Sequence, residues 1–335
     1  AGSAASERFS NRIANPAPRV QTRQTRYFLG SECVALQGAA AGRTKEIKPM
    51  KTRIITAIVG ILVLIGVMFT FNTMVFNLVI AAITLIAIHE IYSALGFEKK
   101  DWLMYAVLVP YTLLVMLSSY SAMRKLVMPM SFVLVTFFAI YLVVRNGTIS
   151  YQKASGLLVF SGIVIFCFYS FILLKERLPV EKFGYDAVFF ILLILCFAWG
   201  GDTCAYFAGR AFGKHKLCPV VSPKKTVEGA IGGVLGTMVF GVVATVIYSI
   251  AANRMEAFTR TNIGVSMYLI IALLACVAAV LGIYGDLFAS VVKRQCGIKD
   301  YGTIFPGHGG ILDRFDSVMF IAPFVTMVIT AVFYA

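Results

Sequence analysis

This sequence has little of what a water-soluble domain needs. Charged residues make up 14% of its 335 residues, and hydrophobic residues make up 59%. A soluble domain carries about 25% charged residues. Negatively charged side chains are fewer than positively charged ones, with 16 Asp and Glu against 30 Lys and Arg. The composition excludes one large water-soluble core and predicts a chain that crosses a membrane several times.

Several common active-site motifs are also missing. No G-x-x-x-x-G-K-[ST] phosphate loop occurs, and Ser93 stands where a H-E-x-x-H zinc motif starting at His89 would need its second histidine. We expect Glu90 to be paired within the helix bundle, and lining of a site is the alternative. The seven cysteines form no C-x-x-C pair. They are therefore interpreted as small apolar side chains rather than as disulfides or metal ligands.

The first 49 residues differ from the rest. They are rich in Ala, Ser and Arg, poor in acids, and contain no apolar span. Two interpretations compete: a leader that is disordered or was added to the natural chain, and a transit-like peptide. The leader is favoured, because Met50 followed by Lys51-Thr-Arg53 and an apolar run resembles a natural start. Residues 1–49 are left out of the functional argument.

The remaining sequence predicts an all-α, polytopic membrane protein with about nine transmembrane helices. Residues 50–183 would hold helices one to five, and residues 184–335 would form the catalytic part with helices six to nine. The expected spans are 54–70, 74–93, 103–120, 126–144, 154–174, 184–208, 228–251, 264–288 and 316–335.

The loops of this arrangement differ in charge. From residue 42 onward, the loops on the N-terminal side carry 18 Lys and Arg, and those on the other side carry 7. Positive loops stay in the cytoplasm. The N-terminus is therefore expected inside and the C-terminus outside, with loops 209–227 and 289–315 facing the cytoplasm.

Four glycines recur along the seventh predicted span. They could suggest a phosphate loop, but small residues at four-residue spacing are a device for packing helices closely. Helix packing is favoured, and glycine-rich spans are also compatible with a homodimer. The residues are Gly229, Gly232, Gly233 and Gly236.

Three carboxylates border the last two predicted spans. Asp286 ends span eight, and Asp313 and Asp316 are three residues apart, hence on one face if that segment is helical. Converging carboxylates repel one another unless a cation lies between them, and oxygen ligands favour a hard ion such as Mg²⁺. One interpretation is a metal site. The other is that the acids only pair with nearby cations, which are Lys293, Arg294 and Arg314.

A second polar block lies in loop 209–227. Its segment Ser222-Pro-Lys-Lys-Thr226 places two cations and a hydroxyl before span seven. Helix starts attract anions through their free N–H groups, so the segment is suited to a triphosphate. The alternative is that Lys224 and Lys225 only hold the loop on the cytoplasmic side.

Two further residues are candidates. Asp202, near the end of span six, is interpreted as a metal or nucleotide contact, with pairing to Arg210 as the alternative. His308 lies in Pro-Gly-His-Gly-Gly, where glycines let backbone approach a ligand closely. This histidine is suited to holding a phosphate or orienting a carboxylate.

Both blocks resemble the signatures of one enzyme family, the phosphatidate cytidylyltransferases or CDP-diacylglycerol synthases. The resemblance covers residues 196–316 well. Cys204 departs from it, because a smaller residue such as Ser, Gly or Ala is expected there. The matching patterns are Asp-Thr-x-Ala-Tyr, Ser-Pro-Lys-Lys-Thr-x-Glu-Gly, Ser-x-x-Lys-Arg, Lys-Asp-x-Gly, Pro-Gly-His-Gly-Gly and Asp-Arg-x-Asp.

The resemblance implies a nucleotidyltransferase of phospholipid biosynthesis that joins CTP to phosphatidic acid, giving CDP-diacylglycerol and pyrophosphate. Its cofactor would be Mg²⁺, with a second cation as an extension. CTP, phosphatidic acid and the lipid bilayer would be its partners, without nucleic acid. The expected location is the bacterial inner (plasma) membrane, with the site facing the cytoplasm.

We hypothesise a role for each candidate residue in this reaction. The metal ligands would be Asp286, Asp313 and Asp316. The other catalytic residues would be Lys293, Arg294 and His308. The substrate phosphates would contact Asp202, Ser222, Lys224, Lys225, Thr226, Lys299 and Arg314.

Two other functions stay open at this point. A CTP-using kinase of a polyprenol or lipid alcohol would also use CTP and a lipid, but it would release CDP instead of pyrophosphate. A secondary transporter would use intramembrane Asp residues as ion ligands, with internal repeats and charges near the membrane midplane. No repeat is seen and the charges gather at one membrane face, so cytidylyl transfer is favoured.

Overall fold

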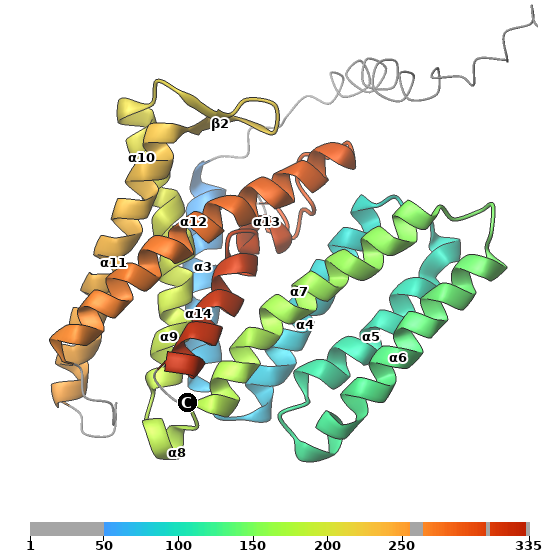
Figure 1. The fold of residues 1–335 in the computed structure, drawn as a ribbon, viewed down its shortest axis with the longest axis horizontal. Helices are drawn as coiled ribbons and strands as arrows, with labels where there is room; N and C mark the ends of the chain where they lie inside the picture. Colours follow the sequence, from blue (N-terminus) through green and yellow to red (C-terminus); the bar gives the residue numbers. More distant parts are fainter. Residues whose placement is uncertain (1–49, 255–263, 306–308, 333–335) are drawn as a thin grey trace, which may run out of the picture. The chain divides into compact units, whose positions relative to one another are not determined.

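The apolar runs of the sequence fold into helices, because a helix satisfies its backbone polar groups internally, as hydrocarbon requires. A computed structural model of the chain describes residues 50–254, 264–305 and 309–332 (Figure 1). The proposed leader 1–49 and the candidate His308 lie outside the described residues.

The first half of the described chain is a series of helices joined by short turns. Side-chain caps begin two of them: Thr73 accepts from the Val75 N–H at 3.2 Å and Ser150 from the Lys153 N–H at 3.3 Å. The helices are α3 (Met50–Phe69), α4 (Met74–Ala94), the short 3-10 helix η1 (Lys99–Asp101), α5 (Trp102–Met116), α6 (Ser121–Val144) and α7 (Tyr151–Arg177).

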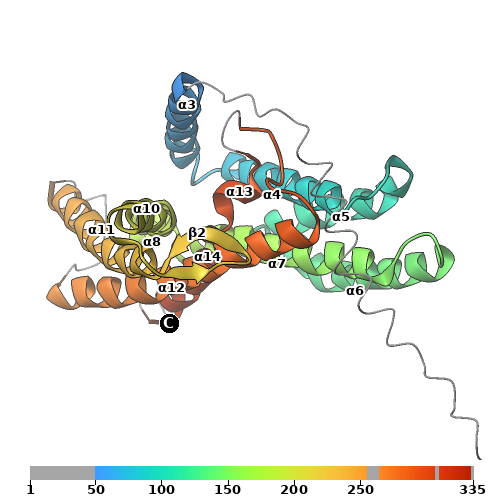
Figure 2. The ribbon, with the colours of Figure 1, turned by 90° about the horizontal axis from the view of Figure 1, so that it is seen from above.

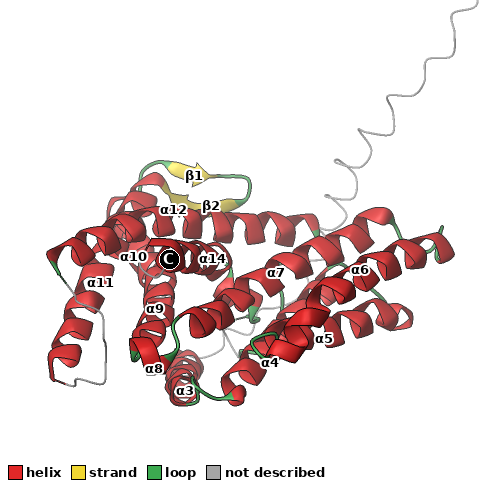
Figure 3. Ribbon diagram, turned by 60° about the horizontal axis from the view of Figure 1, so that its bottom comes forward, coloured by secondary structure: helices red, strands yellow, loops and turns green. Residues whose placement is uncertain are grey.

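The second half contains the polar segments. Its helices are α8 (Val180–Phe183), α9 (Asp186–Leu195), the π-helical turn η2 (Cys196–Gly200), α10 (Gly201–Phe212), α11 (Val227–Arg254), α12 (Val265–Gln295), α13 (Leu312–Phe315) and α14 (Val318–Val332). An antiparallel hairpin of β1 (Lys216–Cys218) and β2 (Ser222–Thr226) joins α10 to α11 (Figure 3).

Six helices in the described part of the chain are long and apolar enough to cross a membrane. Each predicted span overlaps a helix among the described residues, but α5 has 15 residues and is about 22 Å long, short of a hydrocarbon core of about 30 Å. The apolar stretches Ile55–Phe69 and Val318–Ala331 are also shorter than a full span. The structure therefore supports the prediction of a membrane protein with several spans. The number of nine spans and the orientation of the termini stay predictions.

Helices α10 and α11 pack at very short range because α11 carries glycines where they meet. A Cβ on Gly232 would overlap the Cβ of Ala208, and one on Gly236 would overlap the Cys204 side chain. The helix-packing interpretation of these glycines is confirmed, since their partner is α10 of the same chain. The sulfur of Cys204 fits because Gly236 faces it.

Replacing Gly232 by Val should destabilise the protein by about 1–3 kcal/mol, because the added methyls would force α10 and α11 apart. Gly66→Val in α3 is the matched control, because a Cβ there meets no atom within 4 Å. Thermal unfolding in detergent micelles would compare the two. Equal midpoints for both variants would contradict this account of the α10–α11 contact.

The hairpin lies at the upper end of α10 and α11, α8 lies at the bottom, and α13 lies between them, beside α12 (Figure 1). Helix α14 packs against both α7 and α12. In the view of Figure 2, α3 stands away from the other helices. The two polar segments singled out from the sequence are linked by the ion pair of Lys225 and Asp286.

Candidate functional site

Helix α12 and the segment before α14 meet through glycine. A Cβ on Gly285 would lie 2.6 Å from the Asp316 carbonyl oxygen and 3.4 Å from the Ser317 Cα. Because Gly285 has no side chain, Asp286 is brought beside Asp316. The Asp286 carboxylate is an electrostatic neighbour of both Asp316 and Asp202. Three acidic side chains, from α10, α12 and the turn between α13 and α14, therefore share one region.

The hairpin supplies a cation to these carboxylates. The Lys225 Nζ lies 2.5 Å from the Asp286 Oδ2, and both side chains are about one quarter exposed. Ser290 Oγ donates to the other oxygen, Asp286 Oδ1, at 3.3 Å. Lys225, predicted to bind the triphosphate, thus already meets a predicted metal ligand.

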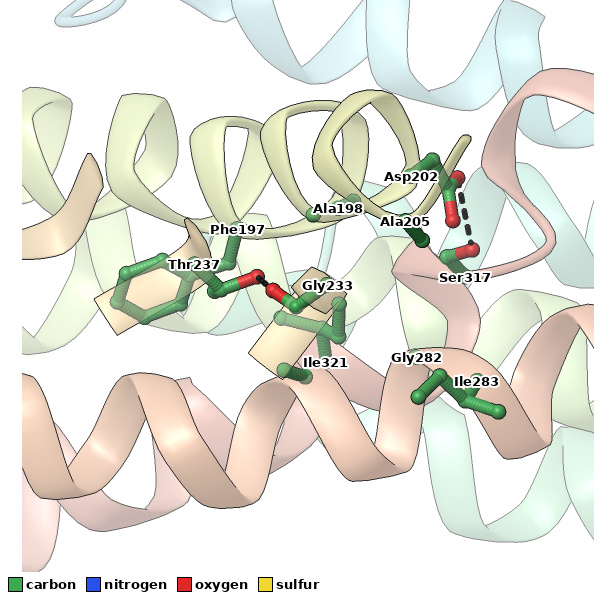
Figure 4. Close-up of a pocket in the computed structure, with 12 residues that line it drawn as sticks. Phe197, Ala198, Asp202, Ala205, Gly233, Thr237, Gly282, Ile283, Ser317 and Ile321 are labelled. Atoms are coloured by element: carbon green, nitrogen blue, oxygen red, sulfur yellow. Dashed lines mark hydrogen bonds between the residues drawn. The ribbon is translucent and has the colours of Figure 1, made fainter. Parts of the chain in front are cut away.

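Asp202 and Ser317 lie together at one end of a small pocket among η2, α10, α11, α12 and α14 (Figure 4). Ser317 Oγ donates to the Asp202 Oδ2 at 3.2 Å, and the Ser317 N–H donates to the Asp316 Oδ1 at 2.9 Å. Arg210 lies two turns further along α10 and donates to the Tyr206 hydroxyl at 3.5 Å. Of the two interpretations of Asp202, the site contact is the one its surroundings favour.

The turn that presents Asp202 is irregular. Residues Cys196–Gly200 form a π-helical turn immediately before α10. Such turns occur often at functional sites, because the extra residue changes the direction of the side chains that follow. Trp199 in this turn donates from Nε1 to the Arg314 carbonyl oxygen at 3.1 Å, which links the turn to α13.

Asp313 has different surroundings from Asp316. Its Oδ1 lies 2.9 Å from the Lys293 Nζ, and its Oδ2 accepts from the Tyr301 N–H at 2.8 Å and the Gly310 N–H at 3.0 Å. Asp313 and Lys293 are each 8% exposed. The interpretation in which an acid pairs with a nearby cation therefore describes Asp313, whose oxygens already have three donors.

Two residues of the Ser-Pro-Lys-Lys-Thr segment differ in exposure. The segment is strand β2 rather than a simple turn, and α11 begins directly after it, as predicted. Thr226 is buried and its Oγ1 accepts from the Gly229 N–H at 3.1 Å, which caps α11. Lys224 is exposed on the same strand. Thr226 thus has a structural contact, and Lys224 is open to a ligand.

The remaining predicted phosphate contacts differ in position. Arg294 is exposed and donates to the Ile298 carbonyl oxygen at 3.4 Å. Arg314 and Lys299 are exposed, and Ser222 is half-buried in β2. These residues lie on α12, in the loop after it, on α13 and on β2, so a common ligand would have to bring them together.

The donors present are those of a hard cation. Among the described residues, no group of three or more His, Cys, Asp or Glu side chains is arranged to hold a metal ion. Mg²⁺ at nucleotide sites is typically held by only one or two carboxylates, with the remaining ligands from phosphates and water. Asp286 and Asp316 are two such carboxylates, and in this structure the cation paired with Asp286 is the Lys225 ammonium.

The sequence reasoning missed one residue of this site and could not find the partners of another. Ser317 contacts two of the carboxylates, and its only signal was its place directly after Asp316. Glu90, expected to be paired within the bundle, accepts hydrogen bonds from Ile311 and Leu312. No local pattern in the sequence could identify partners 221 and 222 residues away.

Comparisons with known proteins agree with the signatures. A phosphatidate cytidylyltransferase of Staphylococcus haemolyticus is 31% identical over 300 residues, covering 84% of this chain and 99% of the relative. One of Bacillus subtilis is 35% identical over 186 residues, covering 55% of this chain and 61% of the relative. One of Staphylococcus aureus is 31% identical over 291 residues, covering 84% and 99%.

The family model agrees with these relatives. The model of the cytidylyltransferase family matches residues 51–332, which include every described element from α4 to α14. The resemblance inferred from the two polar blocks is thereby confirmed. The chain belongs to the cytidylyltransferase family and is a nucleotidyltransferase.

Proposed function

We propose that this protein is a phosphatidate cytidylyltransferase of phospholipid biosynthesis, converting CTP and phosphatidic acid to CDP-diacylglycerol and pyrophosphate. The observation that carries the proposal is the meeting of Asp202, Asp286 and Asp316 with Lys225 at the hairpin end of apolar helices. The names of relatives that align over nearly their whole length support the same reaction.

The reaction places few demands on acid–base groups. An oxygen of the lipid phosphate, already anionic at neutral pH, would attack the α-phosphorus of CTP. The bond between the α-phosphorus and the bridging oxygen would break, and pyrophosphate would leave with the electron pair. The difficulty is that two polyanions must approach one another, so positioning and positive charge matter most.

The carboxylate oxygens of Asp286 and Asp316 are ligands of the kind that Mg²⁺ prefers. When bound, it would neutralise charge on the phosphate oxygens at the reacting centre. Asp202 would add negative potential beside the ion, and its hydrogen bond from Ser317 would hold it in place. The sequence also predicted Asp313 as a ligand, but its contacts with Lys293 and the loop backbone favour a supporting role. A second cation stays an extension of the proposal.

The basic residues would divide by position. Lys224 and Lys225 on β2 would hold the triphosphate, with Thr226 setting the start of α11 behind them. Exposed cations near α12 and α13 would receive the pyrophosphate and the lipid headgroup; these are Arg294, Lys299 and Arg314. Lys293 would act through Asp313, its partner in the buried pair.

The site would face the cytoplasm, where CTP is found. The support is the excess of Lys and Arg in the loops on the same side as the hairpin, because loops rich in Lys and Arg stay in the cytoplasm. A homodimer also stays a proposal. The glycines of α11 no longer support it, because they contact α10 of the same chain.

The test is a product analysis. Purified protein would be incubated with Mg²⁺, CTP and phosphatidic acid in mixed micelles, and pyrophosphate and lipid-linked cytidine would be measured together. Equal amounts of both are expected. Release of CDP would instead favour a lipid kinase, and no consumption of nucleotide with any lipid would favour a transporter.

A further inference from the structure

Glu90 is a buried carboxylate that lies outside the site described above. It is on α4, is 4% exposed, and has no place in the proposed chemistry. Its Oε1 accepts from the Ile311 N–H and its Oε2 from the Leu312 N–H, both at 2.9 Å. Figure 2 shows α13, which these residues begin, beside α4. A side chain from the first half of the chain thus holds the backbone of the C-terminal signature.

The signature loop is shaped to this carboxylate. A Cβ on Gly302 or on Gly310 would overlap the Glu90 carboxylate, so both positions need glycine for the close approach. Two glycines and two N–H groups from one loop therefore surround a single side chain. Such a fit makes Glu90 part of what determines the conformation of the loop.

Asp313 holds the same loop from its other side. It accepts from the Tyr301 and Gly310 N–H groups, so Gly310 lies between Glu90 and Asp313. Burial raises the pKa of the Tyr301 phenol, which stays protonated and donates to the Ala289 carbonyl oxygen on α12 at 3.0 Å. The loop is thereby tied to α4, to α12 and to itself. Asp316 follows directly after this braced segment.

We propose that Glu90 is a positioning residue, which holds the segment from Gly310 to Leu312 so that Asp316 faces Asp286 and Asp202. The role rests on the proposed function, because it concerns the alignment of carboxylates for cytidylyl transfer. Glu90 acts through the backbone and touches none of the three carboxylates in the contacts described. Misplacement of a reacting group by about 1 Å can lower a rate about 100-fold.

The kinetic test compares Glu90→Gln and Glu90→Ala with Asp101→Asn. Asp101 is the matched control, because it is a buried carboxylate of the first half, 5% exposed, that pairs with Arg145 rather than with the loop. We expect kcat per folded molecule to fall about 10-fold for Glu90→Gln and about 100-fold for Glu90→Ala. The KM values for CTP and phosphatidic acid should change much less, since Lys224 and Lys225 stay in place. Asp101→Asn should keep the wild-type kcat.

A double-mutant cycle tests the contact itself. Gly310→Ala alone should lower kcat, because its methyl group would overlap the Glu90 carboxylate. In the background of Glu90→Ala that overlap is gone, so adding Gly310→Ala should cause little further loss. Losses that simply multiply would mean that the two residues act independently and would overturn the proposal.

Hydrogen–deuterium exchange gives a readout that does not depend on activity. In Glu90→Ala, peptides containing Ile311 and Leu312 should exchange faster than in the wild type, while peptides of α10 and α11 stay unchanged. Unchanged exchange in the loop, or faster exchange with a wild-type kcat, would overturn the proposal. A wild-type protein that forms no lipid-linked cytidine would instead overturn the proposed function, and the exchange data would still show whether Glu90 holds the loop.

Discussion

Replacing Asp316 with Asn should lower kcat by about 1,000-fold, because the variant loses a charge that the reacting phosphates and their cation require. The same change should leave the thermal midpoint equal or raise it. Asp316 is 9% exposed and Asp286 repels it electrostatically, so removing the buried charge of Asp316 relieves repulsion between the two carboxylates. Loss of activity without loss of stability is the expected signature of a functional group. Lipid-linked cytidine formation and thermal unfolding in micelles would measure the two effects.

Asp186→Asn is the control for this variant. Asp186 is 2% exposed at the start of α9, far along the chain from α12, and accepts from the Tyr248 hydroxyl at 2.6 Å. We expect it to lower the thermal midpoint while the folded fraction keeps its kcat. An Asp316→Asn protein with normal turnover would remove Asp316 from the metal site.

Replacing Asp313 with Asn should have the opposite pattern and should chiefly destabilise the protein, by about 3–5 kcal/mol. The change leaves the Lys293 ammonium, 8% exposed, without its carboxylate partner. It also weakens the acceptor of the Tyr301 and Gly310 N–H groups. Thermal unfolding would therefore show a large decrease for Asp313→Asn and none for Asp316→Asn.

A second variant separates the two roles of Asp313. Combining Asp313→Asn with Lys293→Met removes both buried charges, and this should recover much of the lost stability. If Asp313 is a metal ligand instead, the single variant should fold normally, and both variants should be inactive. That outcome would restore the set Asp286, Asp313 and Asp316 expected from the sequence.

The sequence allowed accurate prediction of the elements whose signals are local. Each apolar run became a helix, and α11 begins directly after the Ser-Pro-Lys-Lys-Thr segment, because hydropathy and helix starts depend on neighbouring residues. The sequence marked Asp202, Lys225 and Asp286 as candidates in separate segments, but it did not indicate that Lys225 pairs with Asp286. The division of the chain at residue 183 and the number of nine spans stay predictions.

The directions of individual side chains could not be predicted in the same way. Spacing suggested that Asp313 and Asp316 share a face, but α13 has only four residues, and their contacts lie with different parts of the protein. The π-helical turn before Asp202 and the Glu90 contact depend on packing between distant segments. Local periodicity contains no information about such contacts.

The central claim is that Asp286 and Asp316 act on one divalent cation. Binding of Mn²⁺, measured by electron paramagnetic resonance in the presence of CTP, tests it without depending on turnover. The account predicts bound Mn²⁺ in the wild type and its loss in both Asp286→Asn and Asp316→Asn, with Asp186→Asn unchanged. Binding of Mn²⁺ that survives both substitutions at wild-type affinity would contradict the claim.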